Sequence, residues 1–323
     1  MELPGLVLGT SALGNLYRAS TDAEAHRTVD AAWDAGIRAF DTAPHYGLGL
    51  AERRLGRALA GRPREELVLS TKVGRLLVPH PAGAAERDPH EFDVPADLRR
   101  VWDFSRDGVL RSLEESLQRL GTDHVDIAFV HDPDEHWEQA AAEAVPALVE
   151  LRDQGVVRAV GAGMNQSAML TRFVRESDVD LVMCAGRYTL LEQGALDDLL
   201  PAAQERGVPV LAAAVFNSGL LAQPEPGPGS TYEYAGAPPG VLERARRVAA
   251  VCREHGTTLP AAALQLPLAH PAVASIVVGA RSAEEVQADV DLLAAPVPDG
   301  LWDDLRAQGL LRADAPTPQA RRA

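Results

Sequence analysis

Four side chains in this sequence could act together in acid/base chemistry: Asp41, Tyr46, Lys72 and His131. A tyrosine hydroxyl has an ordinary pKa near 10, which is too high for a good base at neutral pH. An ammonium such as that of Lys72 would stabilise the phenolate and lower this pKa, and Asp41 could hold Lys72 in place. His131 could bind the substrate oxygen and relay or orient the proton. The set predicts a tuned acid/base without a nucleophile.

Lys72 is the only lysine among the 31 basic residues, and every other one is arginine. An arginine-rich genome explains why lysine is scarce, because surface lysines can usually be replaced by arginine at little cost. Lysine is hard to replace where a compact ammonium on a flexible stem must lie close to a partner whose pKa it tunes. The surviving lysine therefore points to a role for Lys72.

Each of these residues also has a purely structural interpretation. Asp41 could belong to a turn with the residues up to Pro44, Tyr46 could lie at a rim, and His131 could lie in the helix-capping loop around Asp134. The four residues nevertheless occur at or just after the ends of three successive predicted strands, which favours a shared function.

An alternation of apolar strands and helices would position them. The predicted strands are continuous apolar runs at 6–10, 38–43, 67–73, 125–130, 156–160, 180–185, 208–215 and 274–278. Helices are predicted at 22–35, 50–60, 107–120, 137–154, 166–176, 195–206, 241–255, 260–268, 283–293 and 302–311. Continuous apolar runs are typical of buried parallel strands. Eight such repeats predict an α/β fold, a closed (β/α)8 TIM barrel, whose active site lies at the carboxyl ends of the strands.

We expect residues 1–311 to form one barrel domain and residues 312–323 to be a disordered tail. The competing architecture is a doubly wound sheet, which would normally carry the pattern G-x-G-x-x-G after its first strand. The stretch from Gly9 to Gly14 does not fit that pattern, and the near-match from Gly161 to Gly163 lies in the middle of the chain. The barrel is therefore favoured.

Two long segments should cover the active-site face. Residues 75–104 follow the third strand and residues 222–240 follow the seventh, and long loops in compact domains are usually lids or binding loops. They carry polar and stacking groups that suit a small polyol and could also line a site for an aromatic aldehyde: His80, His90, Trp102, Tyr232 and Tyr234. The candidate substrate-binding residues are His45, Trp102 and His131.

The composition excludes several classes of protein. A net charge of −15 disfavours nucleic acid and anionic membranes as partners, and no apolar run is long enough to span a bilayer. The start of the chain has no basic region typical of a signal peptide. The two cysteines, Cys184 and Cys252, are expected to be buried and reduced, as in a cytoplasmic protein, and no metal site is predicted. A small-molecule substrate and a monomer or small homo-oligomer fit this composition.

Three segments resemble the catalytic segments of the aldo-keto reductase family: FDTAPHYG at 40–47, STKVG at 70–74 and VHD at 130–132. The resemblance covers essentially the whole chain. It implies an NAD(P)-dependent oxidoreductase in which Asp41, Tyr46, Lys72 and His131 are the catalytic tetrad. The longer stretches 44–56 and 101–105 resemble the branch that contains aldose 1-dehydrogenases of the L-fucose and D-threo-aldose type.

A nicotinamide cofactor in this fold would lie across the barrel mouth with its phosphates toward strands seven and eight. Backbone N–H groups after strand seven and the start of the last barrel helix could bind it. Asn165 matches the family asparagine that binds the carboxamide, although it could instead cap the following helix. The usual aromatic platform falls on Ala213, and Phe216 could replace it. The candidate cofactor-binding residues are Asn165, Phe216, Asn217, Ser218, Gly219, Leu220, Gly279, Arg281, Ser282, Glu285 and Asp289.

The choice between NAD and NADP depends on two of these residues. Arg281 could bind an adenosine 2′-phosphate, which favours NADP. Glu285 would repel that phosphate and could accept a ribose hydroxyl instead, which favours NAD. Ser282 and Glu285 also form a capping-box pattern that needs no ligand. We expect NAD, with use of NADP possible.

The resemblance implies oxidation of a sugar lactol to its lactone, with Tyr46 as general base and hydride transfer from C1 to nicotinamide. Reduction of an aldehyde uses the same atoms in reverse, and pyridoxal or another aldehyde or alcohol is the alternative substrate. Two alternatives come from other classes of protein. One is a metal-dependent hydrolase using His131, Asp132, Asp134 and His136, and the other is a non-catalytic nicotinamide-binding regulatory subunit.

Overall fold

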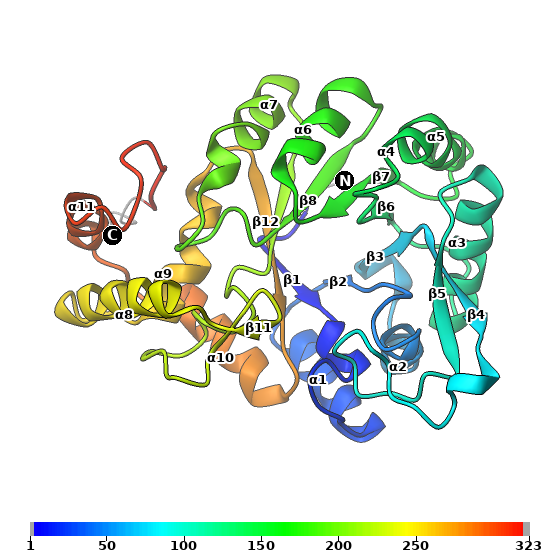
Figure 1. Cartoon of the computed structure of the whole chain (residues 1–323), viewed down its shortest axis with the longest axis horizontal. Helices are drawn as coiled ribbons and strands as arrows, with labels where there is room; N and C mark the ends of the chain where they lie inside the picture. The colour runs from blue at the N-terminus through cyan, green and yellow to red at the C-terminus, as the bar shows by residue number, and fades with distance from the viewer. Residues whose placement is uncertain (1–2, 319–323) are drawn as a thin grey trace.

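The computed structural model describes residues 3–318. Eight parallel strands close into a barrel in the order β1-β12-β9-β8-β7-β6-β3-β2. Figure 1 shows the strands at the centre of the molecule with helices around them. Their bounds are β1 Leu6–Gly9, β2 Ala39–Asp41, β3 Val68–Val73, β6 Ile127–His131, β7 Ala159–Met164, β8 Leu181–Ala185, β9 Val210–Ala213 and β12 Val273–Gly279. The predicted (β/α)8 TIM barrel is confirmed.

Helices surround the barrel. Their bounds are α1 Asp22–Asp34, α2 Leu50–Leu59, α3 Arg106–Leu120, α4 Trp137–Gln139, α5 Val145–Asp153, α6 Ser167–Glu176, α7 Leu199–Arg206, α8 Pro239–Glu254, α9 Leu259–Gln265, α10 Ala283–Ala294 and α11 Asp299–Ala307. Short 3-10 helices lie at Ser11–Gly14, Arg64–Glu66, Pro81–Gly83, Gly194–Leu196 and Pro267–Ala269. Within residues 3–318, no helix combines the length and apolarity that a membrane crossing requires.

Alternate residues of the strands point into the barrel and fill it, among them Ile127, Phe129, Leu181 and Met183. A second apolar layer lies between the strands and the helices around them. The two cysteines are unpaired and buried, as expected, and burial raises the pKa of each thiol to about 12. The barrel interior is thus a packed core, and the chemistry is left to its rim.

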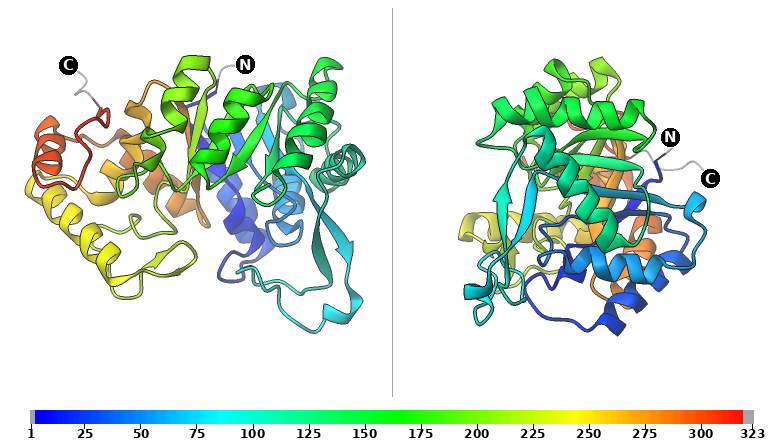
Figure 2. Two further views of the ribbon diagram at one scale, coloured as in Figure 1. Left: turned by 45° about the horizontal axis from the view of Figure 1, so that its top comes forward. Right: turned by 90° about the vertical axis from the view of Figure 1, so that its right-hand side faces the viewer.

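Both long segments contain secondary structure that the sequence did not reveal. Residues 75–104 include an antiparallel hairpin of β4 (Arg75–Pro79) and β5 (Leu98–Trp102), and residues 222–240 include a smaller one of β10 (Thr231–Tyr232) and β11 (Ala235–Gly236). Figure 2 shows both projecting from the same end of the molecule. Two lids therefore flank one barrel mouth, as expected of binding loops.

One predicted helix is interrupted. The expected helix at 137–154 consists of α4, a π-helical segment at Ala140–Ala144 and then α5. Pro146 lies in the first turn of α5 and has no backbone N–H to donate to the preceding turn. A single turn of π-helix accommodates that missing hydrogen bond.

The expected disordered tail is wrong for its first residues. Arg312 donates to Asp197 at 2.6 Å and pairs with Asp314, and Ala315 is 1% exposed within an apolar cluster that includes Trp302 of α11. This packing is long-range, so local sequence could not reveal it. Residues 319–323 of the expected tail lie outside the described residues.

Arg54 of α2 holds the loop after β1 in place. Its buried guanidinium donates to the carbonyls of Leu13 and Ser20 (2.7 and 2.6 Å), to Asn15 Oδ1 (2.7 Å) and to Asp22 Oδ1 (2.8 Å). Replacing Arg54 with methionine leaves these acceptors without their donor. We expect Arg54→Met to lower the free energy of unfolding by about 3–5 kcal/mol in urea titrations.

Arg57, one turn away on the same helix, is the matched control. It also pairs with Asp22, at 3.1 Å, but its side chain is 68% exposed. Arg57→Met should change the free energy of unfolding by less than about 0.5 kcal/mol. Equal effects of the two substitutions would show that Arg54 does not anchor the loop.

Candidate active site

Lys72 lies at the centre of a buried hydrogen-bond cluster at the barrel mouth. Its Nζ donates to Asp41 Oδ2 at 2.5 Å, to the carbonyl of Thr42 at 2.9 Å and to Tyr46 Oη at 3.2 Å. Ser70 donates to the other oxygen of Asp41 at 2.7 Å. The ammonium is therefore satisfied on three sides, and one of its partners is the tyrosine hydroxyl.

The strand order brings these groups together. Asp41 is the last residue of β2, Lys72 lies near the end of β3, and His131 is the last residue of β6. These three strands are neighbours in the barrel, with Asp41 in register with Ser70, and Lys72 with Phe129. The ring of Tyr46 completes the cluster with its centroid 6.1 Å from that of His131.

Two glycines fix the loop that carries Tyr46. Gly47 has a φ of +61°, and a Cβ added to it would lie 2.2 Å from the carbonyl oxygen of Gly14. A Cβ on Gly14 would lie 2.7 Å from the backbone of Tyr46. This close backbone contact between the loops after β1 and β2 holds the tyrosine over the end of β3.

The protonation states differ in part from the sequence expectation. Burial raises the pKa of Tyr46 above its ordinary value, and the Lys72 ammonium opposes this rise without reversing it. The expected net lowering is therefore wrong for the protein alone, because removal from water outweighs one neighbouring charge. Burial alone would lower the pKa of Lys72, but Asp41 and Tyr46 together raise it, so Lys72 stays charged.

The two histidines beside the tyrosine are neutral. Burial, with the nearby charge of Arg75 second, lowers the pKa of both His45 and His131 far below the ordinary histidine value. Within residues 3–318, the buried Nδ1 of His131 has no hydrogen-bond partner. A neutral imidazole can donate a hydrogen bond from one nitrogen, which is what positioning a substrate oxygen requires.

The β4–β5 hairpin covers the substrate side of the cluster. Arg100 of β5 donates to both oxygens of Asp88 at 2.7 Å and to the carbonyl of His45 at 2.8 Å. The His45 ring lies 5.7 Å from that of His131 and contacts Phe92 from the hairpin. Trp102 remains 40% exposed at the mouth. The candidate substrate residues His45 and His131 thus lie side by side, and Trp102 contacts Arg75 of the same hairpin.

The turn after β9 differs from expectation. The amides of Asn217, Gly219 and Leu220 donate to carbonyls within the turn, at 2.8, 3.0 and 3.3 Å, and the Leu220 side chain is fully buried. These three amides, which the sequence analysis offers to the cofactor, are therefore already paired within the turn. Phe216 packs partly buried against the core, and Ser218 accepts from the amide of Tyr234 at 3.2 Å.

Asn165 and Ala213 lie on the barrel rim near this turn. Asn165 donates from Nδ2 to the carbonyl of Ala185 at 3.1 Å, and the N-cap of the following helix is Gln166, so Asn165 does not cap that helix. The side-chain amide of Asn165 therefore lies at the carboxyl ends of β7 and β8, at the barrel mouth. Ala213 ends β9 and is 9% exposed. Because this residue is an alanine, it supplies no aromatic platform for a nicotinamide ring.

The start of α10 carries the remaining cofactor candidates. Ser282 caps the helix by accepting from the amide of Glu285 at 3.2 Å, and Glu285 reaches back to the amide of Arg281 at 2.9 Å. Ser282 therefore caps the helix, whereas Glu285 accepts from the residue before the N-cap and does not complete a capping box. Gly279 ends β12, and burial, with the charge of Glu285 second, raises the pKa of Asp289 to about 7.

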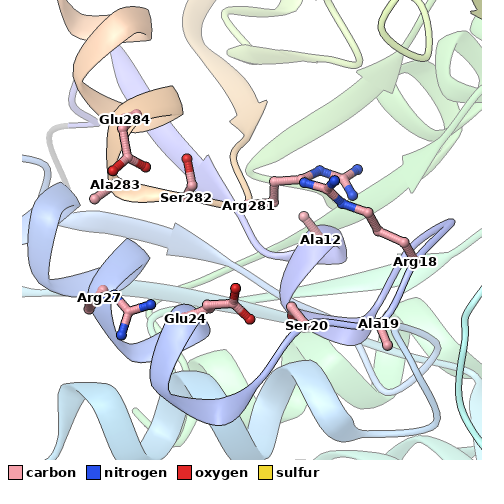
Figure 3. A pocket seen from close by; sticks show the side chains of 10 residues that line it. All are labelled: Ala12, Arg18, Ala19, Ser20, Glu24, Arg27, Arg281, Ser282, Ala283 and Glu284. Carbon is pink, nitrogen blue, oxygen red and sulfur yellow. The ribbon is translucent and has the colours of Figure 1, made fainter.

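A cleft of about 350 Å³ lies between this helix start and the loop after β1 (Figure 3). The guanidinium groups of Arg18 and Arg281 lie next to each other over Ala12, and Arg27 lies on the α1 side. Glu24 and Glu284 also line the cleft, so the part of it that suits phosphate groups is the end at Arg18 and Arg281, beside the helix N-terminus. The sequence analysis missed Arg18 and Arg27, because both come from the opposite end of the chain.

Two further charged residues beside the tetrad were also missed as candidate ligands of the substrate. Arg75 follows Gly74 directly after β3, and Asp132 follows His131 directly after β6. The rule that singled out Lys72 and His131, a polar residue at a strand end, applies equally to them. Within residues 3–318, no group of three or more His, Cys, Asp and Glu side chains could hold a metal ion.

The barrel with a Lys, Tyr, Asp and His cluster at its mouth defines a class of acid/base enzyme. Residues 5–308 match the Aldo/keto reductase family. The chain is 49% identical over 325 residues to the D-threo-aldose 1-dehydrogenase of a Pseudomonas species, covering 98% of this chain and 96% of that protein. It is 39% identical to the pyridoxal 4-dehydrogenase of Microbacterium luteolum, covering 96% and 95%.

A solved aldo-keto reductase from Bacillus halodurans, in its holo form, matches with a TM-score of 0.72 and 27% identity, over 96% of this chain and 93% of that one. This chain belongs to the aldo-keto reductase family. It is accordingly an oxidoreductase that uses a nicotinamide cofactor and acts on a small molecule.

Removing the Lys72 ammonium tests its assigned role. Lys72→Met should reduce kcat at least about 100-fold, because Tyr46 loses the charge that stabilises its phenolate. The dissociation constant of NAD should stay within a few-fold, measured by quenching of protein fluorescence. Loss of NAD binding with turnover near that of the wild type would contradict the role.

The double variant Asp41→Asn with Lys72→Met distinguishes loss of the catalytic ammonium from misfolding of the single variant. It removes both charges of the buried pair, so no carboxylate is left unpaired in the core. It should fold with a melting temperature nearer to that of the wild type and remain as inactive as Lys72→Met.

Proposed function

We propose that this protein is an aldose 1-dehydrogenase that oxidises a cyclic sugar at C1 to its lactone, with NAD as the preferred cofactor. The observation that carries this proposal is the 3.2 Å contact between Lys72 Nζ and Tyr46 Oη, in a chain 49% identical to a D-threo-aldose 1-dehydrogenase. The proposed catalytic residues are Asp41, Tyr46, Lys72 and His131.

Each of these residues has a defined task. Tyr46 removes the proton of the anomeric hydroxyl, while the hydride on C1 leaves for the cofactor. Lys72 stabilises the phenolate of Tyr46, and Asp41 holds Lys72. His131, as a neutral imidazole, donates a hydrogen bond to the reacting oxygen. A nicotinamide cofactor, when bound, would supply the hydride acceptor. The lactol loses one hydride from C1, which carries both electrons, and one proton from its hydroxyl, and becomes the lactone.

Proposed contacts with the cofactor lie on two sides of the mouth. Arg18 and Arg281 bind its phosphates in the cleft at the start of α10. Asn165 binds the carboxamide, and Phe216 lies in place of the aromatic platform that Ala213 lacks. The exposed Glu285 carboxylate lies 4.0 Å from the Arg281 guanidinium and partly offsets its charge, which disfavours a 2′-phosphate.

Initial rates at 340 nm test the substrate class. The panel contains L-fucose, L-galactose, D-arabinose and pyridoxal, each with NAD and NADP. We expect rapid NAD reduction with the sugars and less than about 1% of that rate for Tyr46→Phe. Turnover of pyridoxal without oxidation of any sugar would show that the substrate is pyridoxal and not an aldose, in line with the name of the second relative. Cofactor binding without turnover of any compound would favour a regulatory subunit.

Glu285→Gln tests the basis of NAD preference. Glutamine can still accept from the amide of Arg281, so the helix cap is retained while the charge is lost. We expect the dissociation constant of NADP to fall about 10-fold and that of NAD to change less than about two-fold. Equal effects on both cofactors, or none, would show that Glu285 does not set the preference.

A further inference from the structure

Arg75 and Asp132 form a charged pair beside the tetrad that the proposed reaction does not use. The guanidinium donates from Nη2 to Asp132 Oδ2. Arg75 is the first residue of β4, and Asp132 follows the last residue of β6, so two separate chain segments meet here. Arg75 is only 9% exposed, whereas the Asp132 side chain is 25% exposed. The pair is therefore mostly removed from solvent but open toward the mouth.

The pair lies next to the groups that hold the reacting oxygen. Asp132 Oδ2 is 3.5 Å from Nε2 of His131. The charge of Arg75 is the second-largest influence on the pKa of His131, and that of Asp132 acts on Tyr46. The pair therefore lies beside the position that the C1 oxygen of a bound sugar would take.

The pair has capacity for further hydrogen bonds. Within residues 3–318, the buried Nε of Arg75 has no hydrogen-bond partner. A carboxylate has lone pairs for about four hydrogen bonds, and the guanidinium has five N–H groups. This Nε is enclosed, so the Nη groups and Asp132 would make any further hydrogen bonds to a ligand. Asp132 also has a φ of +42°, in the left-handed region that aspartate adopts more readily than most residues other than glycine.

The charges of the pair cancel, which selects the kind of ligand. An isolated arginine would favour a carboxylate or phosphate, but Asp132 neutralises Arg75. A hydroxyl group both donates and accepts, so it can bridge a guanidinium and a carboxylate. The indole of Trp102 lies beside the pair, with its ring centroid 5.6 Å from Cζ of Arg75. An apolar face next to a donor and an acceptor suits a neutral polyol.

We propose that Arg75 and Asp132 bind the hydroxyl on C2 of the sugar and select its configuration. This inference rests on the proposed aldose oxidation. It names the residues that recognise the configuration at C2, the carbon next to the reacting C1. The guanidinium donates a hydrogen bond to the C2 oxygen, and the carboxylate accepts one from the C2 hydroxyl. An epimer with the C2 hydroxyl on the other face of the ring makes neither of these hydrogen bonds.

The test compares D-arabinose with its C2 epimer D-ribose and with 2-deoxy-D-ribose, which lacks the hydroxyl. L-Fucose and L-galactose share the configuration of D-arabinose at C2, C3 and C4, and a parallel series starts from L-fucose. Wild type should favour D-arabinose by at least about 100-fold in kcat/KM over both comparison sugars, because a site built for a hydroxyl rejects analogues without it. Arg75→Met and Asp132→Asn should each lower this ratio at least about 10-fold, mainly through a higher KM for D-arabinose.

Arg99→Met is the matched control, because Arg99 is an exposed arginine of the same hairpin, in register with Val78. It should retain the wild-type ratio. Folding of each variant is judged by circular dichroism and NAD binding. If Arg75→Met fails to fold, Asp132→Asn tests the C2 preference by itself, because asparagine has nearly the same shape as aspartate. An unchanged ratio in a folded Asp132→Asn variant would overturn the inference while leaving the proposed function intact. Failure of the wild type to oxidise any aldose would overturn both.

Discussion

Burial of one ammonium group beside one carboxylate is the interaction on which the site depends. Both side chains, Lys72 and Asp41, are nearly inaccessible to water, and their charged atoms are 2.5 Å apart. Removing such ions from water costs several kcal/mol each, which only close pairing and additional hydrogen bonds offset. The barrel supplies these by placing β2 and β3 side by side, with Ser70 and the carbonyl of Thr42 as further partners. The tyrosine hydroxyl then takes the remaining direction of the ammonium.

The surrounding loops hold that geometry from outside the barrel. The contact between Gly14 and Gly47 joins the loops after β1 and β2, and Arg54 ties the first of them to α2. On the other side, Arg100 attaches the β4–β5 hairpin to the carbonyl of His45. Loops of this kind can change their substrate contacts while the strands keep the tetrad fixed. This separation fits a family in which related chains are named for sugars and for pyridoxal.

The sequence predicted the barrel and the proximity of Asp41, Tyr46, Lys72 and His131 because both follow from local signals. Continuous apolar strands alternating with helices define the fold, and Asp41, Lys72 and His131 stand at strand ends where the topology must bring them together. The hairpin in residues 75–104 was missed because its register depends on cross-strand pairs such as Arg75 with Trp102. The sign of the change in the pKa of Tyr46 was missed because burial is a property of the folded chain. The packing of Arg312 and Ala315 was missed for the same reason, since their partners are distant in sequence.

The most direct test of the coupling between Lys72 and Tyr46 is a titration of the Tyr46 phenolate. Absorbance near 295 nm is recorded against pH for wild type and for Tyr46→Phe, and their difference isolates one of the five tyrosines. Circular dichroism defines the pH range in which the protein stays folded. The structure predicts a pKa for Tyr46 above the ordinary value near 10, and a further rise when Lys72→Met removes the opposing charge. A Tyr46 titration that Lys72→Met leaves unchanged, or shifts to lower pH, would contradict the account.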